Sequence, residues 1–230
     1  MEQPLISCII PVYNGDRYLR EAIDSIFAQA YRPLEIIVAD DGSTDGTAAV
    51  TATYSNQVRY LSQPNRGPAA ARNLGLRAAL GDFVAFLDAD DLWYPEKLAS
   101  QMARLQKRPE VDLCFAGYRN FWMPDLAEEE ERFRDHALCR PQGGWCIGTL
   151  LARRAAFEKF GHFDEHAREF ENMIWFLRAA GEGAIIELLP DVLMDRRFHP
   201  DNITRTRKAE ISNSFFNLLK DWRDFRRGRP

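Results

Sequence analysis

Five short apolar runs are separated by helix-length segments in the first half of the chain, and this alternation constrains the fold more than any other feature. The runs are candidate buried strands and lie at 5–11, 34–39, 58–61, 83–87 and 111–116. Segments with apolar side chains at helical spacing predict helices at 18–30, 47–54, 68–80 and 95–106. Asp16 is the expected N-cap of the first of them. Because strands joined by helices form parallel sheets, we expect an α/β fold: a mostly parallel central sheet with helices on both faces.

The second half of the chain is less regular. Residues 119–144, with the acidic run 128–131, predict a long loop containing one short helix. Helices are expected at 153–160 and 171–180, and strands at 184–188 and 192–198. An apolar stripe from Ile211 to Trp222 predicts a final helix, which a basic tail follows at 223–229. We expect one domain over residues 1–204, then a C-terminal helix and tail at 205–230.

Polar side chains follow the predicted strands where the strands end. They are Asn14, Asp40, Asp41, Asp88, Asp90 and Asp91. Ligands of open α/β sheets bind beyond the carboxyl ends of the strands, and carboxylates gathered there repel each other unless a cation or hydrogen-bond donors offset their charge. Asp88 and Asp90 form a D-x-D pair of hard oxygen ligands for a divalent cation, which offsets charge on a departing diphosphate. Turn formation or N-capping explains each Asp singly, but explains the set poorly.

Several classes of protein are disfavoured by composition and by absent motifs. A net charge of −4 argues against nucleic acid as a partner. No G-x-x-x-x-G-K-[ST] and no G-x-G-x-x-G after a strand is present, which disfavours P-loop ATPases and dinucleotide dehydrogenases. The four cysteines form no C-x-x-C pair and are expected to be reduced. The N-terminus has no signal-peptide pattern and no run approaches the ~20 apolar residues of a membrane span, so we expect a cytoplasmic protein.

Several motifs occur together in a recognisable order. They are IIPVYNGDRYLREAIDSIFAQAYRPLEIIVADDGSTDGT, QPNRGPAAARNLGL, GDFVAFLDADDLWYPEKL, GHFDE, WFLRA and RRFHPDNIT. Over roughly residues 5–204 the chain closely resembles the family-two glycosyltransferases of GT-A fold. The resemblance implies a nucleotide-binding half at 1–117 and an acceptor and catalytic half at 118–204. It also implies an enzyme that uses a nucleoside-diphosphate sugar, UDP-linked, with Mg²⁺ or Mn²⁺.

The resemblance also implies roles for individual residues. Asp41 sits where the family holds the nucleobase, with its carboxylate accepting the uracil N3–H; Asp88 corresponds to the residue near the ribose, and Arg72 to a cation near the nucleotide. Asp90 corresponds to the metal ligand, and His199 to a histidine that closes over the metal and diphosphate. The implied nucleotide site as a whole consists of Pro11, Val12, Tyr13, Asn14, Asp40, Asp41, Arg72, Asp88 and Ala89.

One departure from the family concerns proton transfer. Where the family usually reads E-D-x-D-W, this chain reads Glu171-Asn172-Met173-Ile174-Trp175. Because an amide has no useful basicity, Glu171 is the predicted catalytic base, and Glu169 is a weaker candidate. The leading hypothesis is an inverting glycosyltransferase. One alternative is a family member that binds a nucleotide sugar or a partner without turnover. The other is a sugar nucleotidyltransferase, which requires a Gly- and Arg-rich loop with a Lys after the first strand.

The sequence leaves the second substrate and the assembly open. The acceptor is a saccharide, a lipid-linked sugar, a peptide or a small molecule. The apolar stripe of the predicted C-terminal helix suits packing on the domain or a homodimer contact. Its basic tail keeps peripheral binding to anionic membranes open as well.

Overall fold

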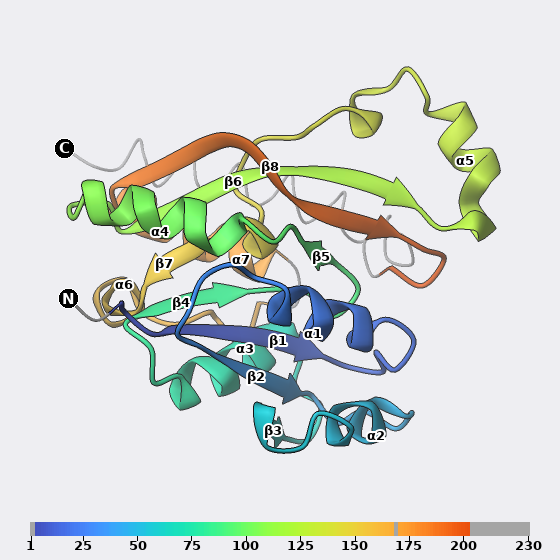
Figure 1. Ribbon diagram of the computed structural model, residues 1–230, viewed down its shortest axis with the longest axis horizontal. Coiled ribbons are helices and arrows are strands. Elements are labelled where there is room, and N and C mark those ends of the chain that lie inside the picture. The colour runs from blue at the N-terminus through green and yellow to red at the C-terminus, as the bar shows by residue number, and fades with distance from the viewer. Residues whose placement is uncertain (1–2, 168–169, 203–230) are drawn as a thin grey trace.

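The computed structural model describes residues 3–167 and 170–202 and is built around one eight-stranded sheet (Figure 1). The strands are β1 Ile6–Val12, β2 Leu34–Asp40, β3 Val58–Ser62, β4 Phe83–Phe86, β5 Leu92–Trp93, β6 Leu113–Trp122, β7 Leu151–Arg153 and β8 Ile186–Phe198. The helices are α1 Leu19–Phe27, α2 Thr47–Ala52, α3 Pro68–Ala78, α4 Lys97–Lys107, α5 Ala127–Arg132, α6 Arg154–Lys159 and α7 Glu171–Gly181. The predicted final helix at 211–222 and its tail lie outside the described residues.

The strand order is β3-β2-β1-β4-β7-β6-β8-β5. The first four strands of this order pair in parallel, as do β6 and β8. Strand β7 is antiparallel to both β4 and β6, and β5 is antiparallel to β8. The α/β class is confirmed, with only parallel pairs among β1 to β4 and both parallel and antiparallel pairs beyond β4. Strands β5 and β7 were not predicted because two or three residues are too few to show a period.

Helices cover both faces of the sheet, as predicted. Side chains of a strand point alternately to the two faces, so Cys8 and Ile10 of β1 join the core beneath α1 and α4, whereas Ile9 joins the core beneath α3, α6 and α7. Aromatic side chains dominate the second core, where Trp175 of α7 stacks on Phe157 of α6 at 4.5 Å between ring centroids. Both faces of the sheet are therefore packed, which explains the nearly unbroken apolar runs of the strands.

Three local predictions were wrong. Asp16 does not cap the first helix, because α1 begins later with Tyr18 at the N-cap, and the Asp16 carboxylate instead accepts the Gly46 N–H at 3.1 Å. The predicted loop at 119–144 begins later, since β6 continues to Trp122. The two strands predicted between 184 and 198 are one strand, β8, whose pairing with β6 is interrupted around Pro190. A proline cannot donate to a ladder and is tolerated at such a bulge.

The parallel strands bring four chain segments to one edge of the sheet. Strands β1, β2 and β4 all end there, and β8, running parallel to β6, carries residue 199 toward the same region. Helix α5 lies beyond the ends of β6 and β8 (Figure 1). Among the described residues no helix is long and apolar enough to cross a bilayer.

Candidate functional site

The D-x-D turn follows β4 directly. Asp88 and Asp90 are partly exposed, whereas Asp91 is buried and accepts the Arg197 N–H at 2.9 Å. Burial raises the pKa of Asp91 well above its ordinary value, and the charges of Asp90 and Asp88 raise it further. The turn therefore places three carboxyl groups close together, and the negative charge of buried Asp91 is disfavoured there.

The loop after β1 lies against this turn. A Cβ on Gly15 would come within 2.5 Å of the Val12 side chain and 3.5 Å of the Ala89 Cβ. Val12 and Ala89 belong to one apolar cluster, Ala89 at its margin. The absence of a side chain at Gly15 thus avoids a clash with the Val12 side chain where the loop after β1 lies against the Asp88–Asp90 turn.

His199 and Asn202 approach Asp90 from beyond β8. The Asp90 Oδ2 lies 3.0 Å from His199 Nε2 and accepts a hydrogen bond from Asn202 Nδ2 at 3.0 Å. The backbone N–H of His199 donates to Asn202 Oδ1 at 2.6 Å. The buried Nδ1 of the His199 ring has no hydrogen-bond partner in the described part of the chain. The imidazole packs at 4.9 Å from the Tyr18 ring. The predicted metal pair is therefore assembled from positions 109 residues apart.

Arg72 joins Asp88 to Glu171. This arginine of α3 is 4% exposed; its Nη2 donates to Asp88 Oδ1 at 2.8 Å and its Nη1 to Glu171 Oε1 at 2.5 Å. Burial by itself would lower the pKa of the Arg72 guanidinium, but Asp88 and Glu171 raise it above its ordinary value. Glu171 is itself buried, at the first position of α7, and Asn172 next to it is partly exposed. The structure thus ties the end of β4 to the start of α7 through one buried cation.

The end of β1 and the loop after β2 form the next part of the site. Pro11 and Val12 are buried within β1, whereas Tyr13 is 54% exposed. Asn14, with φ of 51°, accepts the Thr44 N–H at 2.8 Å, and its own N–H donates to Ser43 Oγ at 2.8 Å. The exposed Tyr13 ring is consequently available for stacking.

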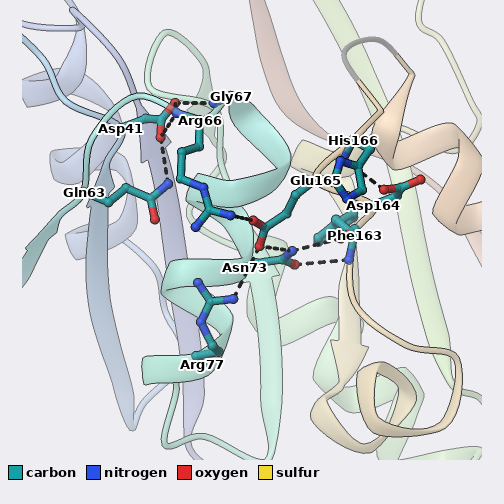
Figure 2. Close-up of polar contacts among 10 residues, drawn as sticks. All are labelled: Asp41, Gln63, Arg66, Gly67, Asn73, Arg77, Phe163, Asp164, Glu165 and His166. Atoms are coloured by element: carbon teal, nitrogen blue, oxygen red, sulfur yellow. Dashed lines mark hydrogen bonds and ion pairs between the residues drawn. The ribbon is translucent and has the colours of Figure 1, made fainter.

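Asp40 and Asp41 point to different partners. Asp40 accepts the Tyr60 hydroxyl at 2.5 Å and the Ser43 N–H at 2.8 Å. Asp41 is 3% exposed and accepts Gln63 Nε2 at 2.7 Å and the Gly67 N–H at 2.7 Å. Figure 2 shows this second set, in which the Arg66 N–H also donates to both Asp41 oxygens. Both carboxylates therefore fix the loops around the site, and Gln63 occupies one acceptor position of Asp41.

Some residues of the site were missed at the level of sequence. Asn202, which holds both Asp90 and His199, was visible only as part of the RRFHPDNIT motif. Arg197 was considered only as a possible diphosphate contact or a solvated residue, yet it is buried and its Nε donates to the Asp90 carbonyl at 2.8 Å. Glu169, the weaker candidate base, lies outside the described residues. No group of three or more His, Cys, Asp or Glu side chains with metal-site geometry occurs in residues 3–167 and 170–202.

Comparison with known proteins identifies the family of the chain. Residues 7–169 match the profile of the family described as glycosyl transferase family 2. The chain belongs to this family. It is similar to an uncharacterized glycosyltransferase of Rickettsia typhi, with 35% identity over 95% of this chain and 69% of the relative. Family membership makes the chain a glycosyltransferase.

Solved structures show the same fold at low sequence identity. S. aureus TarS 1-349 in complex with UDP-GlcNAc gives a TM-score of 0.72 at 22% identity, covering 86% of this chain and 59% of that one. The mannosyltransferase PcManGT from Pyrobaculum calidifontis, in complex with GDP-Man and Mn²⁺, gives 0.68 at 24% identity, covering 90% of this chain and 61% of that one. The chain thus spans about three fifths of these solved proteins. The GT-A fold is confirmed.

Proposed function

We propose that this glycosyltransferase moves a sugar from a UDP-linked donor to an acceptor with inversion, using Mg²⁺ or Mn²⁺. The observation that carries the proposal is the meeting of Asp90 and His199 beside Asp88 at the end of β4. In this proposal residues 1–117 supply most of the donor site, while residues 118–204 supply His199 and the acceptor side.

The residues around Asp90 fit a divalent cation. Adjacent ligands of an octahedral ion with bonds of about 2.1 Å lie about 3 Å apart, which is the separation of Asp90 Oδ2 and His199 Nε2, 3.0 Å. Mg²⁺ is commonly held by one or two carboxylates together with substrate phosphates, and Asp90 supplies one such carboxylate. Asp90 and His199 would hold the ion, and its chemistry would be to offset the charge that develops on the departing diphosphate.

The donor nucleotide is proposed to lie along the ends of β1 and β2. The exposed ring of Tyr13 offers a stacking surface for a base, and Pro11, Val12 and Asn14 form the strand end and turn beneath it. Asp41 accepts a hydrogen bond from the uracil N3–H, which replaces the hydrogen bond that Gln63 donates to the same carboxylate. Asp40 shapes the loop through Ser43, while Asp88, Ala89 and Arg72 border the ribose. The TarS complexes hold UDP and UDP-GlcNAc and the PcManGT complex holds GDP-Man, so the uridine preference is proposed from Asp41 alone.

Proton transfer is assigned to Glu171. Arg72 engages Oε1 of this carboxylate, and Oε2 makes no hydrogen bond or ion pair within the described residues. We propose that Oε2 takes the proton of the acceptor nucleophile as it attacks the anomeric carbon from the face opposite the diphosphate. Asn172 orients the acceptor by hydrogen bonding. A thiol acceptor, with a pKa of ~8.5, would need less help from a base than a hydroxyl.

A panel of labelled sugar nucleotides tests the proposal. The enzyme is incubated with Mn²⁺, each donor and a mixture of candidate acceptors, and transferred label is separated from free sugar. We expect transfer from a UDP-sugar, loss of transfer with EDTA, and no transfer by Glu171→Gln, which still binds UDP. Transfer at the wild-type rate by Glu171→Gln would show that another group is the base. Absence of turnover with every donor would favour a nucleotide-sugar-binding role, the reading that Asn172 keeps open.

A further inference from the structure

Glu165 stands at the centre of a polar cluster outside the catalytic groups named above. Its carboxylate binds Arg66 Nη2 at 2.8 Å, Asn73 Nδ2 at 3.0 Å and Arg77 Nη1 at 3.5 Å. Figure 2 shows these side chains converging from α3 and from the loop before it. The hydrogen bond from Asn73 lowers the pKa of the Glu165 carboxyl below its ordinary value; burial opposes this shift, and Arg66 and Arg77 add to it. The carboxylate is therefore charged at neutral pH. We call Glu165, Arg66, Asn73 and Arg77 the Glu165 cluster.

One end of the Glu165 cluster reaches the proposed nucleotide site. The Arg66 N–H donates to the Asp41 carboxylate, at 3.0 Å and 3.1 Å to its two oxygens, while the Arg66 side chain binds Glu165. Gly67 follows with a φ of +96°, a conformation that favours glycine, and its N–H also donates to Asp41. Helix α3 begins at the next residue. A single residue, Arg66, thus contacts both the proposed base-binding carboxylate and Glu165.

The other end of the Glu165 cluster holds the segment that leads to α7. Asn73 is 2% exposed; its Oδ1 accepts the Phe163 N–H at 3.1 Å and its Nδ2 donates to the Phe163 carbonyl at 2.9 Å. The preceding residue of α3, Arg72, holds Glu171. Two consecutive residues of one helix therefore fix Phe163 and Glu171, eight positions apart, and with them the place at which α7 starts.

We propose that the Glu165 cluster is a positioning link between the loop at residues 63–67, which holds Asp41, and the start of α7. Through this link, binding of the donor holds Glu171 and Asn172 in the positions in which they contact the acceptor. The proposal rests on the donor site assigned above to Asp41. Glu165 and Asn73 act through other residues and are positioning groups. A surface ion pair alone contributes little to stability. Here the buried Asn73 amide and Arg66 both bind the Glu165 carboxylate, so the link is a network of interactions and not a single ion pair.

Hydrogen exchange of the free protein tests the link without any ligand. Glu165→Gln and Arg66→Met remove the charge pair at partly exposed positions, and both variants are expected to fold. Glu158→Gln is the matched control, because it makes the same substitution in an exposed ion pair with Arg154 on α6. We expect exchange at 171–176 to rise by about threefold in each variant, and no further in the double variant. The control and Arg66→Lys, which keeps the charge, should resemble the wild type. Unchanged exchange at 171–176 in both variants would overturn the link.

A second arm adds UDP and Mn²⁺ at saturating concentration. In the wild type, UDP should slow exchange at 171–176; in Glu165→Gln, which calorimetry should show still binding UDP, at least about half of that slowing should disappear. Equal slowing in the two proteins would overturn the proposal. If the wild type binds no UDP, the donor assignment fails, while the comparison of the free proteins still decides whether Glu165 positions α7.

Discussion

Removal of the Glu171 carboxylate should destabilise the protein. The contacts of Arg72 give an estimate of the free energy that is lost. The guanidinium is buried and has two carboxylate partners, Asp88 at 2.8 Å and Glu171 at 2.5 Å. Deleting one partner of a buried ion pair costs about 3–5 kcal/mol, whereas a hydrogen bond to a charged group contributes about 1.5–3 kcal/mol. We therefore expect Glu171→Ala to cost about 4 kcal/mol. Glu171→Gln, which keeps an acceptor oxygen, should cost about 2 kcal/mol.

Urea denaturation at pH 7 measures both values, provided that the m-values of variant and wild type agree. Glu158→Gln, in an exposed pair on α6 whose glutamate side chain is 69% exposed, serves as the control and should change the unfolding free energy by less than about 0.5 kcal/mol. Asp88→Asn should cost less than Glu171→Ala, because Asp88 is partly exposed. A cost below about 1 kcal/mol for Glu171→Ala would refute the buried ion pair.

Three further changes have definite expected results. Asn172→Asp should raise the rate of transfer to hydroxyl acceptors, because it restores a carboxylate at the position of the family's base; a rate equal to or below that of the wild type would contradict this. UDP should displace a labelled donor better than CDP does, because the uracil N3–H can replace Gln63 as a donor to Asp41, whereas cytosine N3 carries no proton to donate; equal competition would remove the uridine preference. Burial lowers the pKa of Lys97 to about 7, so above that pH the unfolded chain binds a proton that the folded protein lacks, and stability rises with pH. The unfolding free energy of the wild type relative to Lys97→Met should therefore grow by about 1–2 kcal/mol between pH 7 and pH 8.5, and a constant difference would show that Lys97 stays charged.

Strand and helix periods predicted residues 1–117 well because strands β1, β2 and β4 bury nearly all of their apolar residues. Strands β1, β2, β3 and β4 and helix α3 lie within two residues of the predicted ranges. The antiparallel strands β5 and β7 were not predicted, since their two or three residues have no period of their own and their pairing is decided by distant partners. The gap left between the predicted strands at 184–188 and 192–198 likewise lies within β8.

The positions of the candidate site residues were predictable from the strand ends and the order of the motifs. The hydrogen-bond and ion-pair partners of these residues were not predictable. Asp40 ends β2 and Asp41 begins the bend after it, and they bind different partners, Tyr60 of β3 and Gln63 of the following loop. The pairing of Arg72 with Glu171 spans 99 residues and depends on how α7 packs against the sheet. The roles of Asn73 and Asn202 depend on backbone and carboxylate groups that meet only in the folded protein.

Calorimetric titration with UDP in the presence and absence of Mn²⁺ tests the central claim most directly. The proteins compared are the wild type, Asp90→Asn and Asp82→Asn, the last being a matched change at an exposed residue just before the opposite end of β4. We predict that EDTA weakens UDP binding to the wild type and to Asp82→Asn by at least about tenfold. Asp90→Asn should bind UDP weakly whether or not Mn²⁺ is present. Binding by Asp90→Asn that is as tight and as dependent on Mn²⁺ as that of the wild type would contradict the account.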